Sequence, residues 1–277
     1  MAGKLYICGT PIGNLEDITV RALRILKEAD LIAAEDTRNT IKLLNSYEIK
    51  TPLTSYHKFN EEEKGKRLVE KLKEGANIAL VSDAGMPGIS DPGEVLINMC
   101  IDEGIEVSVV PGPTAVVSAL VLSGISSRSF VFEGFLPANK HMRKEVLNRL
   151  KAETRTTVFY EAPHHLTDTL SELYETVGDR KAAAVREISK KHEEAVRLNL
   201  KELWEHFKEN PPKGEFVIVI EGREKEEEYE NVLTVREQFE LFLEQGYDRK
   251  TAMKLCAKER GVSKKAVYAK LLKDKED

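Results

Sequence analysis

The first 125 residues alternate between short apolar segments and amphipathic segments, and this alternation constrains the fold more than any other feature. Each apolar segment has the length of a strand and is followed by a loop and then by apolar residues at helical spacing. Strands that are separated by helices pair in parallel, and a parallel sheet is covered on both faces. The sequence therefore predicts an α/β domain built on a parallel sheet, with strands at residues 4–9, 31–34, 51–56, 77–81 and 106–110.

After Gly124 the regular alternation of strand-like and helical segments ends. Strand-like segments at residues 181–187 and 193–199 follow each other with no helix between them, which predicts a mixed sheet and a second α/β domain. Helical segments are expected at residues 140–151, 165–177 and 200–209. The expected organisation is an N-terminal α/β domain over residues 1–125, a second α/β domain over 126–222, an acidic linker over 223–232 and a basic helical module over 233–277.

The C-terminal module resembles a helix-turn-helix. Ala257 and Gly261 are four residues apart, Val267 lies six residues further on, and Gly-Val-Ser would form the turn. Residues 248–273 hold nine Lys or Arg against two acidic residues. Two interpretations remain open: a small packing or dimerisation module with a solvated basic face, or a nucleic-acid contact through phosphates.

Residues 79–93 form the most unusual loop of the chain. A buried-type strand runs directly into a segment with three Gly and two Pro, interleaved with Ser82, Asp83, Ser90 and Asp91. Glycine lets a backbone approach a ligand closely, and open α/β sheets place ligands at the carboxyl ends of their strands. We interpret the segment as a ligand loop; the alternative is a surface turn.

Composition and motifs exclude several classes of protein. A 41% hydrophobic and 32% charged composition fits a soluble globular protein, and no apolar run approaches the roughly 20 residues that span a bilayer. A strand begins at once after the N-terminus, and the three cysteines have no disulfide or metal spacing, so we expect a cytoplasmic protein without a signal peptide. A net charge of −5 argues weakly against nucleic acid as a partner. Gly9 and Gly13 do not complete a dinucleotide fingerprint, and no phosphate-binding Gly-Lys-Ser/Thr loop is present.

Several longer segments are distinctive when taken together. The segments in the first domain are Gly9-Thr-Pro-Ile-Gly-Asn, Ala34-Glu-Asp-Thr-Arg, Val81-Ser-Asp-Ala-Gly-Met-Pro-Gly-Ile-Ser-Asp-Pro-Gly and Val110-Pro-Gly-Pro. Those in the second domain include Tyr160-Glu-Ala-Pro-His-His-Leu and Gly214-Glu-Phe-Val-Ile-Val. Together these segments resemble the tetrapyrrole (corrin/porphyrin) methylase superfamily, and most closely its branch that methylates ribosomal RNA. The resemblance covers residues 4–222 almost continuously. Met86 departs from it, because a small polar residue is usual at that position.

The resemblance implies a methyl donor, S-adenosylmethionine, in a cleft between two α/β domains, and a homodimer. It implies 2′-O-methylation of a cytidine ribose in the decoding region of 16S ribosomal RNA, within the small ribosomal subunit. Carried over by position, the donor-binding residues would be Pro11, Gly85, Gly88, Ile89, Ser90, Thr114, Ala115, Tyr160, Gly214 and Glu215. For Thr114 and Ala115 the alternative is a plain helix start, and for Gly214 and Glu215 it is a simple start of a strand.

The implied chemistry needs positioning and a proton acceptor, since a ribose hydroxyl is a poor nucleophile. It needs no metal, and no His or Cys cluster of ligand spacing is present. Carboxylates and a histidine near strand ends are the candidates, together with an arginine that could hold one carboxylate ionised. The candidate catalytic residues are Asp36, Arg38, His57 and Glu187, with Glu161 also at a strand end. Asp36 and Arg38 could equally form a structural ion pair, and His57 could belong to a helix-capping loop.

Positive charge gathers where RNA would be bound. Residues 140–155 hold six Lys or Arg against two Glu. The candidate RNA-binding residues are Lys140, Arg143, Lys144, Lys190 and Lys191. A solvated helix face and an exposed hairpin tip are the alternatives. Two other functions remain open: a small-molecule methylase of the precorrin type, and a nucleic-acid-binding regulator that uses the C-terminal helices.

Overall fold

The structure is a computed structural model and describes residues 2–224 and 233–273. The chain divides into two compact units, Met1–Arg223 and Glu224–Asp277. Most of the expected acidic linker, residues 225–232, lies outside the described residues, as do residues 274–277. No helix among the described residues is long and apolar enough to cross a bilayer.

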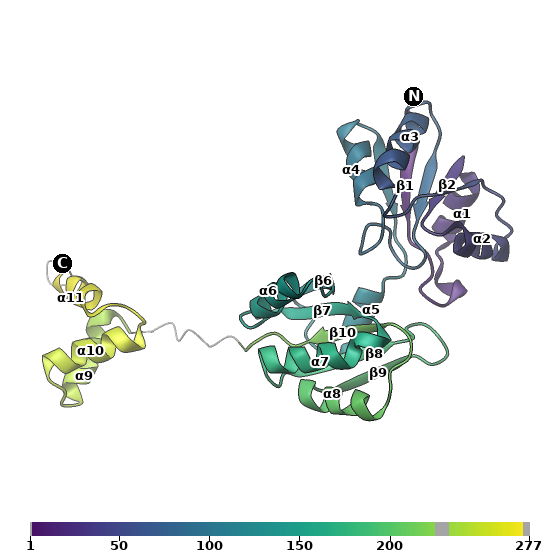
Figure 1. The fold of residues 1–277 in the computed structure, drawn as a ribbon. Coiled ribbons are helices and arrows are strands. Elements are labelled where there is room, and N and C mark those ends of the chain that lie inside the picture. The colour runs from purple at the N-terminus through teal and green to yellow at the C-terminus, as the bar shows by residue number, and fades with distance from the viewer. Residues whose placement is uncertain (1, 225–232, 274–277) are drawn as a thin grey trace. The chain divides into compact units, whose positions relative to one another are not determined.

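The first sheet is parallel throughout, as the alternation in the sequence predicts. Its strand order is β3-β2-β4-β1-β5, and every neighbouring pair is parallel (Figure 1). The strands are β1 (Lys4–Cys8), β2 (Leu31–Ala34), β3 (Leu53–Ser55), β4 (Ile78–Val81) and β5 (Glu106–Val110). The helices between them are α1 (Val20–Glu28), α2 (Thr37–Ser46), α3 (Glu61–Lys73) and α4 (Glu94–Asp102), with a short 3₁₀ helix, η1 (Leu15–Asp17), before α1.

Alternating side chains of the first sheet enter two separate cores. In β1, Leu5 and Ile7 pack with apolar residues of α3 and α4, whereas Cys8 packs with those of α1 and α2. This is the period of two that a strand imposes, and here both faces are apolar because helices cover both. All five strands point their carboxyl ends to the same edge, where the conspicuous loops begin.

The second sheet is mixed, as the two consecutive strands predict. Its order is β6-β7-β10-β8-β9; β6 and β7 pair in parallel, and the remaining pairs are antiparallel. The strands are β6 (Phe130–Phe135), β7 (Thr156–Glu161), β8 (Lys181–Arg186), β9 (Glu194–Asn199) and β10 (Phe216–Ile220). The central strand β10 is buried along its whole length, which explains its uninterrupted Phe-Val-Ile-Val-Ile sequence.

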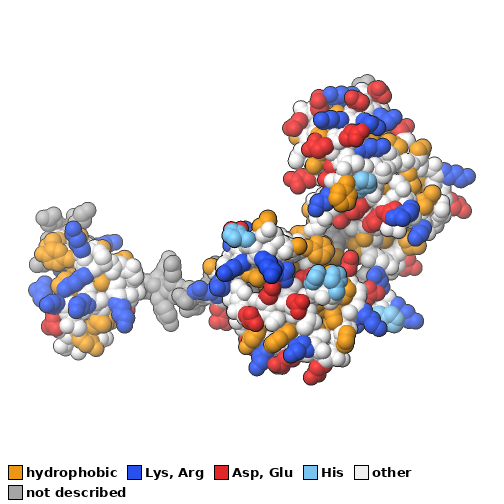
Figure 2. Space-filling view, viewed as in Figure 1, with side chains coloured by type: hydrophobic (Ala, Val, Ile, Leu, Met, Phe, Trp, Pro, Cys, Tyr) orange, Lys and Arg blue, Asp and Glu red, His pale blue; other side chains and the backbone are white. Residues whose placement is uncertain are grey.

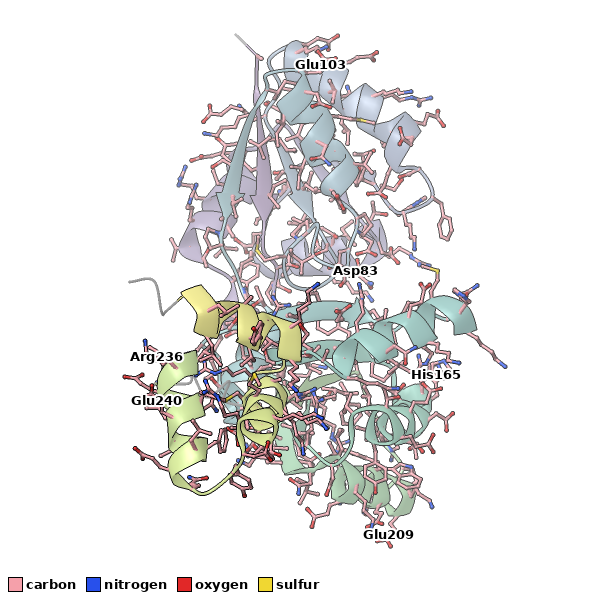
Figure 3. All side chains as sticks on the ribbon, turned by 90° about the vertical axis from the view of Figure 1, so that its left-hand side faces the viewer. Asp83, Glu103, His165, Glu209, Arg236 and Glu240 are labelled. Atoms are coloured by element: carbon pink, nitrogen blue, oxygen red, sulfur yellow. The ribbon has the colours of Figure 1, made fainter. Side chains whose placement is uncertain are left out.

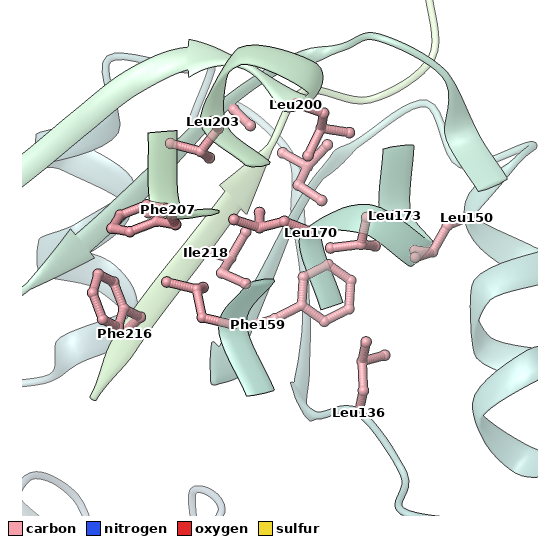
Figure 4. Packing of buried hydrophobic residues seen from close by; sticks show 14 of the residues in the cluster. Leu136, Leu150, Phe159, Leu170, Leu173, Leu200, Leu203, Phe207, Phe216 and Ile218 are labelled. Atoms are coloured by element: carbon pink, nitrogen blue, oxygen red, sulfur yellow. The ribbon is translucent and has the colours of Figure 1, made fainter. Parts of the chain in front are cut away.

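Helices cover the two faces of the second sheet unequally. One face packs against α6 (Lys140–Leu150), α7 (Pro163–Val177) and α8 (Leu200–Glu209), in the core drawn in Figure 4. The other face packs against α5 (Ala115–Ser123) through Val116, Ala119 and Leu120. The domain boundary at residue 125 stays a prediction. Helix α5 follows the last strand of the first sheet in sequence but packs on the second sheet.

The described part of the C-terminal unit, residues 233–273, holds three helices where the sequence predicts helical segments. They are α9 (Val235–Glu244), α10 (Arg249–Glu259) and α11 (Lys264–Lys273). Gly261 has a φ of 63° and lies in the turn between α10 and α11, a conformation that favours glycine. Phe239, Phe242, Cys256 and Val267 meet in a core of this unit's own.

Candidate functional site

A cavity of about 530 Å³ lies between the carboxyl ends of the first sheet's strands and one end of the second sheet. Figure 3 places Asp83, which lines it, at the end of the first sheet that faces the second. From the first sheet, the loops after β1, β2, β4 and β5 contribute Ile12, Glu35, Asp83, Ala84, Gly85, Met86, Ile89, Ser90, Asp91, Thr114 and Ala115. From the second sheet come Phe135, Tyr160, Val185, Arg186, Glu187, Ile188, Lys190, Gly214, Glu215, Phe216 and Val217.

Close backbone contacts hold the loops of the first sheet together. The Thr10 amide donates to the Gly85 carbonyl over 2.9 Å, and the Gly85 amide donates to the Thr10 carbonyl over 3.1 Å. The buried Thr10 hydroxyl donates to the Ser82 carbonyl over 3.2 Å. The loop after β1 is thus tied to the loop after β4, and together they form one wall of the cavity.

The loop after β4 is held from outside the cavity as well. Gly93 caps α4 without a side chain, so two distant side chains serve the first amides of that helix. The Leu96 amide donates to the buried Tyr56 hydroxyl over 3.1 Å, and the Gly93 amide donates to the Glu61 carboxylate over 3.1 Å. Ser90 has a φ of 65°, a strained value for a residue with a side chain. Fixed at both ends, this loop can keep Ser90 on the cavity wall.

Carboxylates dominate the charge of the cavity wall. Glu35, Asp83, Asp91, Glu187 and Glu215 line it. Burial, followed by the charge of Glu35, raises the pKa of Asp91 to about 6, and burial also raises the pKa of Glu35. A hydrogen bond from Ser82 opposes the shift at Asp91. A wall with this excess of acidic groups attracts a cation.

Aromatic and aliphatic side chains form the other part of the wall. The ring of Tyr160 packs against Phe132 and Phe135, with centroids 4.9 and 5.5 Å apart. Burial raises the pKa of Tyr160 to about 12, so the phenol stays protonated at neutral pH. Phe135 remains half exposed beside the cavity. This part of the wall suits a flat, weakly polar group such as a purine base.

The hairpin between β8 and β9 reaches from the second sheet to the first. Glu187 and Ser189 have φ values of 51° and 66°. The Ser189 hydroxyl donates to the Asp17 carboxylate in η1. The Lys190 ammonium lies 2.9 Å from the Glu187 carboxylate, and a Cβ on Gly13 would lie 2.5 Å from Lys190 Cε. The hairpin therefore closes one side of the cavity, and a side chain at position 13 would force Lys190 to move.

Most of the predicted donor-binding residues line this one cavity. Gly85, Ile89, Ser90, Thr114, Ala115, Tyr160, Gly214 and Glu215 do so. Pro11 and Gly88 do not, although each has neighbours in sequence that line it. Pro11 is followed by Ile12, and Gly88 is followed by Ile89. In each loop, therefore, the residue after the predicted one lines the cavity.

Of the four predicted catalytic residues, Glu187 lines the cavity and the other three do not. Asp36 caps α2 and forms a two-pronged pair with Arg38, which holds the pKa of Asp36 down at about 2. The Asp36 amide also donates to the Asp83 carboxylate over 3.1 Å. Asp36 thus contacts a residue that lines the cavity but does not line it itself. Glu161 is buried and accepts hydrogen bonds from Thr169 and from its neighbour's amide.

His57 lies in the loop before α3. Its backbone amide donates to the Asn60 side-chain oxygen over 2.8 Å, and its Nε2 lies 3.3 Å from the Asn60 amide nitrogen. Its Nδ1 is buried and has no hydrogen-bond partner among the described residues. Phe59 beside it is 94% exposed. His57 is near enough to Glu35 to lower that residue's pKa, against the larger effect of burial.

The predicted RNA-binding residues differ in their surroundings. Lys140 and Lys144 are exposed on α6, where Figure 2 shows Lys and Arg side chains gathered, and Lys191 is exposed in the β8–β9 hairpin. Lys190 is paired with Glu187 at the cavity. Arg143 instead turns into the protein: its Nε donates to Glu172 over 2.6 Å, and another guanidinium nitrogen donates to Thr169 over 2.8 Å.

Sequence reasoning missed several residues of the cavity wall, chiefly Glu35, Asp91, Phe135 and Arg186. Asp91 lies in the loop that the sequence singled out, and Glu35 precedes Asp36, so the positions of these two residues in the sequence offered a signal. Phe135 and Arg186 are the last residues of β6 and β8. Nothing in the sequence says that these strand ends meet the first sheet. Among the described residues, no group of three or more His, Cys, Asp or Glu could hold a metal ion.

Comparison with known proteins gives a consistent result. A family model described as Tetrapyrrole (Corrin/Porphyrin) Methylases matches residues 4–204. A Halalkalibacterium halodurans protein named ribosomal RNA small subunit methyltransferase I is 48% identical over 270 residues, which cover 96% of this chain and 93% of that protein. A Thermotoga maritima protein with the same name is 51% identical over 222 residues, 80% of this chain and 100% of that protein.

Solved structures share the fold at lower identity. A diphthine synthase matches with a TM-score of 0.65 and 16% identity, over 80% of this chain and 90% of that one. A uroporphyrin-III C-methyl transferase from Thermus thermophilus, complexed with S-adenyl homocysteine, matches with a TM-score of 0.56 and 21% identity, over 78% of this chain and 97% of that one. At these identities the likeness establishes the two-sheet architecture.

Proposed function

Since the chain belongs to the tetrapyrrole (corrin/porphyrin) methylase family, we propose that it is an S-adenosylmethionine-dependent methyltransferase of ribosomal RNA. The methyl group goes to the 2′-hydroxyl of a cytidine ribose in the decoding region of 16S ribosomal RNA. The observation that carries this proposal is the match, along nearly the whole chain, to a protein named ribosomal RNA small subunit methyltransferase I.

The cavity fits the proposed donor. S-adenosylmethionine supplies a methyl group that is activated by attachment to a sulfonium cation. A volume of about 530 Å³ falls within the range of roughly 300–1,000 Å³ that is usual for small-molecule sites. Glu35, Asp83 and Asp91 offer negative charge to a sulfonium or an ammonium, and Phe135 and Tyr160 offer an aromatic wall to a base. The ten predicted donor-binding residues remain part of the proposal, with Pro11 and Gly88 supporting the loops.

The residues of the chain act mainly by positioning. The cavity lies between the two sheets. Two loops of the first sheet are tied together at Thr10 and Gly85, and the β8–β9 hairpin of the second sheet is tied to η1 through Ser189 and Asp17. A rigid wall of this kind holds two reactants in line and excludes water. Glu187 is the predicted catalytic residue that lines the cavity, and its carboxylate can accept a hydrogen bond from the ribose hydroxyl and take its proton. Lys190 balances the charge of that carboxylate at 2.9 Å.

The RNA is proposed to lie across exposed positive charge outside the cavity. Lys140 and Lys144 on α6 and Lys191 in the β8–β9 hairpin present ammonium groups to solvent, as phosphate contacts require. The Arg38 side chain is 87% exposed and pairs with Asp36. The Asp36 amide in turn donates to Asp83, which lines the cavity, so Arg38 lies near the cavity wall. We also propose that the protein acts in the cytoplasm, that it is a homodimer and that it uses no metal.

Incubation of the protein with methyl-labelled S-adenosylmethionine and small ribosomal subunits tests the proposal. We expect label in the 16S RNA, at one linkage that resists alkali, because alkaline cleavage needs a free 2′-hydroxyl. Naked 16S RNA and a mixture of uroporphyrinogen-type tetrapyrroles serve as parallel substrates. Label in the tetrapyrroles alone would overturn the RNA substrate, and label in RNA at alkali-sensitive linkages would overturn the ribose as acceptor.

A further inference from the structure

The C-terminal unit is a folded body with its own core. Phe239 and Phe242 of α9, Cys256 of α10 and Val267 of α11 are each at most 8% exposed and pack together. Hydrogen bonds also join the end of α10 to α9 and to the segment before α9: Arg260 donates to the Gln238 side chain and to the Leu233 carbonyl. The outer surface of α10 and α11 is therefore not needed to complete a core within this unit.

Charge is segregated over the surface of this unit. Two of the three acidic side chains of α9 have local partners: Glu240 pairs with Arg236 over 3.2 Å, and Glu237 closes a capping box with Thr234. Figure 3 labels Arg236 and Glu240 on that helix. Basic side chains occupy α10 and α11, and Figure 2 shows them spread over one face of the unit.

Six lysines of α10 and α11 lack ion-pair partners among the described residues. Three of them recur every four residues and so share one exposed face of α10. The other three lie on α11, where one is half-buried and two are exposed. The six are Lys250, Lys254, Lys258, Lys264, Lys265 and Lys270. Unbalanced like charges repel one another, and a polyanion would relieve that repulsion.

Helix α11 adds an aromatic side chain to this positive charge. Tyr268 is 54% exposed and Leu272 is 48% exposed. Lys265, Tyr268 and Leu272 are spaced by three and four residues, so they share one face of the helix. An exposed tyrosine ring beside lysines can stack on an unpaired base while the lysines contact the neighbouring phosphates. A face made only to be solvated would gain nothing from Tyr268 and Leu272.

We propose that the α10–α11 surface, defined by the six lysines with Tyr268, binds single-stranded or loop RNA. The lysines contact phosphates, and Tyr268 stacks on an unpaired base. The proposal rests on the proposed function for the choice of RNA over other polyanions. The surface supplies affinity rather than chemistry, because the donor cavity is built wholly from residues of the other unit.

The test uses the full chain and a fluorescein-labelled RNA hairpin with the sequence of the small-subunit decoding region. The variant carries Lys264→Ala, Lys265→Ala and Tyr268→Ala together. We expect its affinity for the hairpin to fall roughly tenfold or more, through loss of one stacked base and two phosphate contacts. The slope of log affinity against log salt should fall by about 1.4, at about 0.7 for each lysine removed.

A double variant, Lys66→Ala with Lys71→Ala, removes the same charge from exposed positions of α3 and serves as the matched control. It should change neither the affinity nor the salt slope appreciably. Circular dichroism and donor binding of the triple variant should match those of the parent protein, which excludes misfolding as the cause.

Two outcomes overturn the inference. One is an unchanged affinity and salt slope in the folded triple variant. The other is parent protein that binds a DNA duplex of the same sequence more tightly than the hairpin, with the triple variant losing only the DNA. A failure of the proposed function looks different: the parent protein would bind the hairpin through this surface but transfer no label to RNA from the donor.

Discussion

The backbones of Gly9 and Gly112 meet so closely that neither residue has room for a side chain. A Cβ on Gly9 would lie 2.7 Å from the Gly112 Cα, and a Cβ on Gly112 would lie 2.8 Å from the Gly9 Cα. Gly9 directly follows β1, and Gly112 follows the neighbouring strand β5 after one residue, Pro111. The contact brings the two loops together, so that Ile12 and Thr114 can line one cavity.

Replacing Gly9 with alanine should therefore damage both stability and donor binding. The new methyl group would meet the Met86 sulfur, which can move, and the Gly112 backbone, which cannot move without shifting the loop. Overpacking of this kind costs about 1–3 kcal/mol. We expect a melting temperature lower by several degrees and a weaker affinity for S-adenosylmethionine, measured by scanning and titration calorimetry.

Gly124→Ala is the control for this prediction. Gly124 has a φ of 70°, and a Cβ there would meet nothing within 4 Å. The substitution should cost stability through backbone strain, about 1 kcal/mol, and leave donor affinity unchanged. If both variants lose donor affinity equally, the Gly9–Gly112 contact does not shape the cavity.

The sequence predicts the first sheet well because local rules decide it. Both faces of a parallel sheet are buried, so apolar runs such as Ile78–Val81 stand out, and the loops that follow them carry the Gly and Pro of close backbone contacts. The loops proposed to bind the donor are predicted from the same pattern together with the resemblance. Position in the sequence is a poor guide to packing partners, however: α5 follows the last strand of the first sheet in the chain but packs on the second sheet.

Single side chains within the site were harder to predict. Arg143 and Lys144 are neighbours on a basic helix, yet one bonds internally and the other is exposed, because a helix turns by about 100° between residues. Glu161 and Glu187 both end or follow strands, but only Glu187 faces the cavity. Such differences depend on how the second sheet packs against the first, and no short sequence pattern predicts that packing.

The raised pKa of Asp91 should make stability depend on pH. Its folded pKa of about 6 lies above the ordinary value of 3.8 for an aspartate, so the folded protein binds this proton more tightly than the unfolded chain does. Stability should therefore fall as pH rises from about 4 to 6 and then level off. Asp91→Asn removes this cost, so the variant should melt at a higher temperature than the parent at pH 7.5, with the difference shrinking towards pH 4.5. An equal difference at both values would contradict the assignment.

The same titration should control binding of the cationic donor. Ionised Asp91 adds negative charge to the wall, so affinity for S-adenosylmethionine should rise between pH 5 and pH 7. S-adenosylhomocysteine lacks the sulfonium charge and should gain less over that range, which provides a matched ligand. In Asp91→Asn the gain for the donor should shrink to what Glu35, with its own raised pKa, still supplies. Titration calorimetry at both pH values measures each affinity.

Substitution of Glu187 should affect the transfer step if the proposed function is correct. Glu187→Gln keeps the size of the side chain but cannot take a proton from the ribose hydroxyl. General base catalysis is worth about 10²–10⁴-fold, so kcat should fall by about 100-fold or more while donor affinity changes little. Asp36→Asn is the comparison, because Asp36 does not line the cavity. Steady-state methylation of small subunits would decide, and an equal loss of kcat in both variants would remove the distinction between them.

Arg143 and Lys144 should separate stability from RNA binding. Arg143 bonds to Glu172 and Thr169, and the Thr169 hydroxyl donates over 2.6 Å to the buried Glu161 carboxylate, so α6, α7 and β7 are joined through one guanidinium. Arg143→Ala should cost about 2 kcal/mol through the loss of these bonds, one of them charge-assisted. Lys144→Ala should leave the melting temperature unchanged and weaken hairpin binding, because its ammonium is exposed and free for a phosphate.

Thermal melting and fluorescence anisotropy of the two variants, side by side, test this. If Arg143→Ala stays as stable as the parent and loses more RNA affinity than Lys144→Ala, then Arg143 contacts RNA, as the sequence alone predicts, and its internal bonds are dispensable.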